Sequence, residues 1–119
     1  MTKVQLELYT RPTWTDCQAG KEFLSKNNVS YIEYDLTKQP SKEDDLVKIT
    51  GTRIVPTFVF KNKSLLGLMS KPKVLIGFEQ NIDEIRKILN IKNWYHLSHY
   101  LAAGIISVIY IPYQRIVIN

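Results

Sequence analysis

A chain of 119 residues with a hydrophobic share of 45% is long enough for one domain with a buried core. Four of its five net positive charges arise beyond Glu84, where every charged residue is basic: Arg86, Lys87, Lys92 and Arg115. Basic side chains do not cluster among aromatics, which argues against a nucleic-acid-binding protein. The single cysteine excludes an intramolecular disulfide and a zinc site built from cysteines.

The first element is predicted as a strand over residues 4–9. Val4, Leu6 and Leu8 alternate with polar residues, and a period of two indicates a strand with one buried face. This opening segment has neither the apolar stretch nor the small-residue cleavage site of a signal peptide. We therefore expect a reducing, cytoplasmic location.

A helix is predicted next, beginning near residue 14. Thr13 and Asp16 have the spacing of a capping box. Cys17, Gly20, Phe23 and Leu24 follow at helical spacing, so this side should face the core. The two asparagines at 27 and 28 end the helix.

A second strand is predicted over residues 29–36, which are rich in β-branched and aromatic residues. Pro40 and Ser41 begin a second helix, with Asp44 at the box position, and Gly51 ends it.

The third strand is predicted over residues 54–60, with Pro56 near its start, and the fourth over residues 74–78. The loop between them is long, and its apolar middle argues against a free loop. Asn81, with Glu84 at the box position, is predicted to cap a third helix whose apolar side carries Ile82, Ile85, Ile88 and Leu89.

The order of elements is therefore β-α-β-α-β-β-α. A β-α-β unit favours a parallel pair joined by a right-handed crossover, and two closely spaced strands favour an antiparallel hairpin. We expect an α/β protein with a small mixed central sheet flanked by helices over residues 1–92. Residues 93–119 form a hydrophobic C-terminal extension.

Three segments carry a family resemblance: "YTRPTWTDC" at 9–17, "RIVPTF" at 53–58 and "LIGF" at 75–78. Together with the order of elements they resemble the glutaredoxin family, which implies a thioredoxin-like fold over residues 3–90. Family members typically read Tyr-Thr-x-x-x-Cys-Pro-x-Cys, where the first cysteine is the nucleophile and the second resolves the mixed disulfide. Here Trp14 stands at the nucleophile position, Thr15 at the proline, and only the resolving position, Cys17, is a cysteine.

The resemblance implies a thiol-disulfide oxidoreductase that serves cell redox homeostasis by passing electrons to protein disulfides. Its own chemistry is expected to be impaired, because Cys17 is the one candidate catalytic residue left. The alternative is a binding module without catalysis, which holds a peptide or protein partner on the same scaffold. For Cys17 the competing interpretation is a small buried residue, and for Trp14 it is a chance replacement at a surface turn.

The resemblance also implies a substrate site. Pro56 matches the family's cis-proline, and the backbone of Val55 beside it would pair with an extended substrate such as glutathione or a peptide. Arg11 matches a position facing the glutathione carboxylate. Gly77 and Phe78 are closer to the glutaredoxin-like electron donors of ribonucleotide reductase, which thioredoxin reductase serves. The candidate substrate-binding residues are therefore Arg11, Trp14, Thr15, Val55, Pro56, Gly77 and Phe78.

No bound cofactor is implied; glutathione would be a co-substrate, and glutathione or thioredoxin reductase the reductant. His96 and His99 are spaced three residues apart, but they lack a carboxylate or cysteine partner, so no metal site is expected.

The extension has an apolar core at residues 101–111. Eleven residues are too few to cross a bilayer, which needs about 20. Its aromatics, with Lys92 and Arg115 at the flanks, would suit a membrane interface, while a dimer contact or an aggregation-prone strand are alternatives. The favoured interpretation is an extra helix that packs on the domain or on a partner.

Removal of residues 93–119 should leave a folded domain, because the four predicted strands and the first three predicted helices are complete by Ile91. Thermal unfolding followed by circular dichroism should remain cooperative in the shortened chain. Loss of a cooperative transition would show that the extension is part of the fold.

Overall fold

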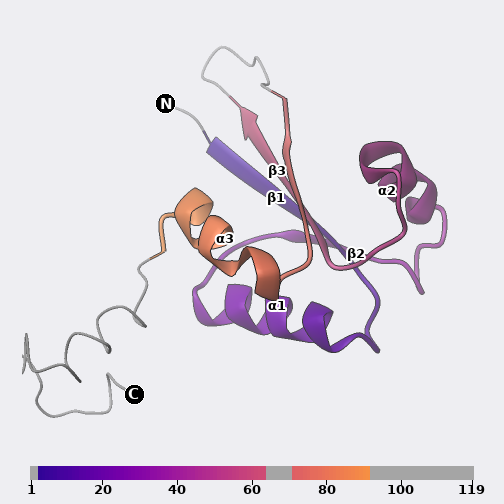
Figure 1. Cartoon of the computed structure of the whole chain (residues 1–119), viewed down its shortest axis with the longest axis horizontal. Coiled ribbons are helices and arrows are strands. Elements are labelled where there is room, and N and C mark those ends of the chain that lie inside the picture. Colours follow the sequence, from indigo (N-terminus) through magenta and orange to yellow (C-terminus); the bar gives the residue numbers. More distant parts are fainter. Residues whose placement is uncertain (1–2, 64–70, 92–119) are drawn as a thin grey trace, which may run out of the picture. The chain divides into compact units, whose positions relative to one another are not determined.

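A computed structural model describes residues 3–63 and 71–91 of the chain (Figure 1). The chain divides into two units after Ile82. The sheet and the first two helices belong to the first unit. The predicted extension with its boundary at residue 93, the two histidines and the apolar middle of the long loop lie outside the described residues.

The described strands form a four-stranded mixed sheet. They are β1 (Lys3–Thr10), β2 (Ile32–Asp35), β3 (Thr57–Lys63) and β4 (Lys73–Ile76), in the order β2-β1-β3-β4. β1 pairs in parallel with β2, while β1–β3 and β3–β4 are antiparallel. The predicted parallel first pair and antiparallel last pair are confirmed, and so is the α/β class.

The described helices are α1 (Thr15–Lys26), α2 (Lys42–Thr50), the short 3₁₀ helix η1 (Glu79–Asn81) and α3 (Ile82–Leu89). Asn27 is the C-cap of α1, and Gly51 ends α2 in the left-handed conformation at φ 80°. Glycine has no Cβ to clash in that conformation. Both predicted helix ends are therefore confirmed.

The predicted capping boxes of the first two helices are wrong, although Ser41 does stand at the start of the second helix. The N-cap of α1 is Trp14 and that of α2 is Ser41, and neither helix start receives a side-chain cap hydrogen bond. At the start of the third helix, the side-chain amide nitrogen of Asn81 donates to the carbonyls of Ile76, at 2.7 Å, and Gly77, at 2.9 Å. At the first helix, the Asp16 carboxylate accepts backbone amides of the turn after β4, so a tertiary partner takes precedence over the local cap.

The prediction of one buried face for β1 is wrong as well, because Glu7 and Tyr9 are buried beside Leu6 and Leu8. β1 is an inner strand, and residues that alternate along it meet a helix on each side. On one side, a Cβ added to Gly20 of α1 would lie 3.1 Å from the Phe58 ring, so the helix sits close to the sheet.

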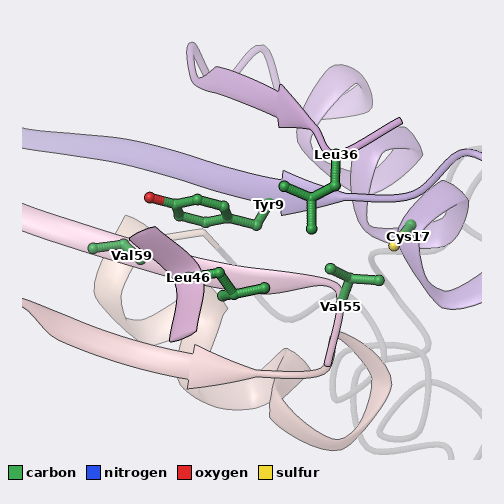
Figure 2. Packing of buried hydrophobic residues seen from close by; sticks show 6 residues of the cluster. All are labelled: Tyr9, Cys17, Leu36, Leu46, Val55 and Val59. Carbon is green, nitrogen blue, oxygen red and sulfur yellow. The ribbon is translucent and has the colours of Figure 1, made fainter. Parts of the chain in front are cut away.

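On the other side of the sheet, Leu46 of α2 joins Tyr9 and Val59 in a cluster of buried side chains (Figure 2). Cys17 and Val55 belong to the same cluster. The core thus reaches from the middle of the sheet to the start of α1, where the chain leaves β1.

Candidate functional site

The start of α1 carries the residues that the sequence singles out. Trp14 has an extended backbone, at φ −93° and ψ 124°, and its carbonyl accepts hydrogen bonds from the amides of Cys17 and Gln18. Its indole is 46% exposed. Because no side chain caps the helix, the first amides of α1 stay available to a ligand, at the positive end of the helix dipole.

Cys17 lies too deep in the helix to share that exposure. It is 1% exposed and packs in the cluster with Val55 and Leu36 (Figure 2). Burial raises the pKa of the thiol, and the charge of Asp16 acts in the same direction. A hydrogen bond from the Arg11 backbone and the charges of Arg11 and Lys21 lower it, but burial is the largest effect. The thiol is therefore a protonated core group.

Asp16 connects the helix start to the turn after β4. One carboxylate oxygen accepts the amide of Phe78 at 2.7 Å, and the other accepts the amide of Glu79 at 3.2 Å. Hydrogen bonds to a charged acceptor are stronger than those between neutral groups. The carboxylate thus fixes two segments that lie more than sixty residues apart in the chain.

These two segments and the loop before β3 enclose an open cleft of about 780 Å³. Four of the candidate residues line it directly: Trp14, Thr15, Val55 and Gly77. The remaining lining residues are Asp16, Ala19, Ile54, Glu79 and Gln80. All of them belong to the first unit of the chain.

Pro56 and Phe78 stand behind the wall of the cleft. The Val55–Pro56 peptide bond is cis, and the carbonyl of Pro56 accepts the amide of Gly77 at 2.7 Å. The Phe78 ring packs against those of Phe23 and Phe58 and is 5% exposed. Both residues shape the cleft from the core and do not line it with their side chains.

Arg11 also lies outside the cleft lining. Its guanidinium contacts a carboxylate oxygen of Glu43 at 3.3 Å and donates to the carbonyl of Arg53 at 3.1 Å. Arg53 in turn contacts the second oxygen of Glu43 at 2.8 Å. Arg11 thus ties the helix start to α2 and to the loop before β3.

Sequence reasoning missed several residues of this site. Asp16 was assigned to a local cap, and Ile54, Glu79, Gln80 and Glu43 were not considered. A signal existed for Asp16, which lies beside Trp14 and Cys17, and for Ile54, which lies in the segment 53–58. Glu79 and Gln80 face the cleft and Glu43 pairs with arginines because the fold brings together segments that are distant in sequence. No local pattern of residues predicts that arrangement.

Within residues 3–63 and 71–91, no group of three or more side chains of metal-ligating type comes together. None of the helices in those ranges is long and apolar enough to cross a membrane.

The comparisons with known proteins agree with this architecture. The sequence model of the glutaredoxin family matches residues 6–65. The crystal structure of the thioredoxin-like protein BC3987 is 30% identical at a TM-score of 0.51, covering 74% of this chain and 100% of that one. The crystal structure of a mutant of the same protein is 31% identical at a TM-score of 0.57, covering 74% and 97%.

A thioredoxin from Plasmodium falciparum shares the fold at 18% identity and a TM-score of 0.54, with 72% of this chain and 70% of that one covered. No curated protein matches the sequence.

Asp16→Ala should lower the free energy of unfolding by about 1–3 kcal/mol, because two backbone amides lose a charged acceptor. Asp44→Ala is the matched control, since it removes an exposed carboxylate from the first turn of α2. Both variants lose the same kind of interaction with a helix dipole. The difference between their losses in free energy of unfolding, measured by chemical denaturation, therefore reports the bonds from Asp16 to Phe78 and Glu79. Equal losses would show that the link adds nothing.

Iodoacetamide should alkylate Cys17 of the folded chain at least about tenfold more slowly than the denatured chain, because burial shields the sulfur and keeps it protonated. The folded thiol holds its proton to higher pH than the unfolded one. The protonated thiol therefore contributes fully to the stability of the fold at neutral pH. This contribution falls as the pH rises above the pKa of the thiol in the unfolded chain. Mass spectrometry of quenched samples gives the rates, and equal rates would contradict the burial.

Proposed function

Since the chain belongs to the glutaredoxin family, we propose that it acts in thiol redox metabolism with a substrate cleft but with impaired disulfide exchange of its own. The observation that carries this proposal is the pairing of an exposed Trp14 at the helix start with a Cys17 that is 1% exposed. Exchange needs a thiolate that can approach a disulfide sulfur, and an indole supplies only an N–H donor.

The position of residue 14 supports the same proposal. At the N-cap of α1, the first backbone amides are free of a side-chain cap and could donate hydrogen bonds to a thiolate, which would lower its pKa. The side chain there also faces the cleft. Cys17, one turn further, is suited to resolve a mixed disulfide but is poorly placed to begin one.

The family's usual partners are glutathione and protein disulfides, and the proposal assigns a member of these classes to the cleft. Val55 supports this assignment. Its side chain packs in the core, so its backbone is the part that an extended chain would meet in the cleft wall. Glutathione or thioredoxin reductase would serve as reductant in a cytoplasmic setting.

A second candidate function is a binding module without catalysis. Trp14 and Ile54 favour it, because they are 46% and 49% exposed and both line the cleft. Exposed apolar side chains around a concave surface are typical of a site for a peptide or protein partner. The two functions differ in whether electrons reach the bound partner.

Trp14→Cys should raise disulfide reduction at least about tenfold, since it places a thiol at the helix start and returns Cys17 to a resolving role. Residues three apart on a helix are close enough to form a disulfide. The measurement is reduction of a mixed disulfide coupled to glutathione or to thioredoxin reductase.

Trp14→Ser is the matched control, because it opens the same space without adding a thiol. Trp14→Cys combined with Cys17→Ser should lose the dithiol reaction. The proposal fails if the unmodified chain already turns over well and Cys17→Ser abolishes that activity. Tight partner binding without turnover in Trp14→Cys would favour the binding module.

A further inference from the structure

Among the described residues, the charged side chains that line the cleft are acidic. Asp16 and Glu79 are in its wall, and no lysine or arginine is among the lining residues that the structure describes. The rest of the lining includes the exposed apolar side chains of Trp14 and Ile54. The cleft therefore combines an apolar surface with negative charge.

The start of α1 does not reverse this charge. A helix N-terminus carries about half a positive charge, but Asp16 lies in the first turn and offsets it. The Asp16 carboxylate is held by the amides of Phe78 and Glu79, so its position beside the helix start is fixed. An anion that enters the cleft meets no cationic side chain among the described residues that line it.

Two arginines lie close in sequence to residues that line the cleft, and both form ion pairs with Glu43. Arg11 precedes the Trp14 turn, and Arg53 precedes Ile54. Glu43 contacts their guanidinium groups through one oxygen each, at 3.3 and 2.8 Å. The hydrogen bond from Arg11 to the Arg53 carbonyl, at 3.1 Å, fixes the same arrangement. Glu43 thus pairs with one nitrogen of each arginine, and Arg11 also donates to the backbone.

We propose that the cleft selects an extended segment of a protein that carries an apolar residue between basic flanks, and that Glu43 determines this preference over glutathione by holding the two arginines. The proposal rests on the proposed function, because it names the substrate class of the same cleft. The apolar residue would cover Trp14 and Ile54, and the basic flank would face Glu79 and Asp16.

The physical reason is charge complementarity. Glutathione has two carboxylates and one ammonium group, so it carries a net negative charge at neutral pH and is repelled by the lining carboxylates. A basic segment is attracted by the same groups. Complementary charges across an interface favour the right partner, and like charges disfavour the wrong one.

Calorimetric titration of the full chain with three probes tests the proposal. Two are acetylated and amidated peptides, Lys-Ser-Val-Leu-Val-Ser-Lys and Glu-Ser-Val-Leu-Val-Ser-Glu, and the third is S-methylglutathione, which cannot exchange disulfides. The basic peptide should bind about three- to tenfold more tightly than the acidic one at low salt, and the ratio should shrink at high salt. S-methylglutathione should bind more weakly than the basic peptide.

Two variants test which residues cause the preference for the basic peptide and against S-methylglutathione. Glu79→Gln should reduce the ratio between the two peptides. Glu43→Gln should raise the affinity for S-methylglutathione about two- to fivefold by releasing the arginines. Glu22→Gln is the matched control, because it removes one negative charge from an exposed pair with Lys26 on α1. Circular dichroism checks that each variant is folded.

Equal or reversed affinities of the two peptides, or no binding of either, would overturn the proposal. An unchanged S-methylglutathione affinity in Glu43→Gln would overturn the role of Glu43. These results are independent of the redox assay. If Trp14→Cys gains activity while the peptides show no charge preference, the proposed function stands and this inference fails. If the preference holds and Trp14→Cys gains nothing, the redox part of the proposed function fails.

Discussion

The carboxylate of Asp16 is the interaction on which the site depends. It lies in the first turn of α1 and binds the amides of Phe78 and Glu79, which begin the turn after β4. Packing of the Phe78 ring against Phe23 of α1 supports the same junction. Because both oxygens are used, the carboxylate fixes orientation as well as distance, and the cleft has a defined wall on this side.

The core imposes the second constraint. The same cluster contains Val55, which stands in the cleft wall, and Cys17, which the cleft does not reach. A thiol in that cluster contributes packing, and burial raises its pKa. Reactivity and core packing make opposite demands on a cysteine, and at residue 17 the fold satisfies the packing demand. The exposed position, residue 14, carries an indole.

Charge is arranged around the cleft in two separate groups. Inside it are the carboxylates of Asp16 and Glu79, and outside it Glu43 connects Arg11 with Arg53. One residue of each group also stabilises the fold: Asp16 binds the turn after β4, and Arg11 binds the loop before β3. The residues that set the electrostatics of the cleft are thus partly those that position its walls.

The sequence by itself determined the class of fold, the order of elements and the family. The alternating and helical patterns are local, and the segments around Trp14, Pro56 and Gly77 are contiguous motifs, so both can be recognised without coordinates. It also determined that dithiol chemistry is absent from this chain, since that needs only a count of cysteines.

Only the tertiary structure decided what Asp16, Arg11 and Glu43 do. The spacing of Thr13 and Asp16 predicted a local cap, yet the carboxylate binds amides 62 and 63 residues away. Arg11 was expected to face a ligand, yet Glu43 of α2 lies within ion-pair distance. A polar side chain bonds to the strongest complementary group within its reach. That group is set by how strands and helices cross, which no local pattern of residues contains.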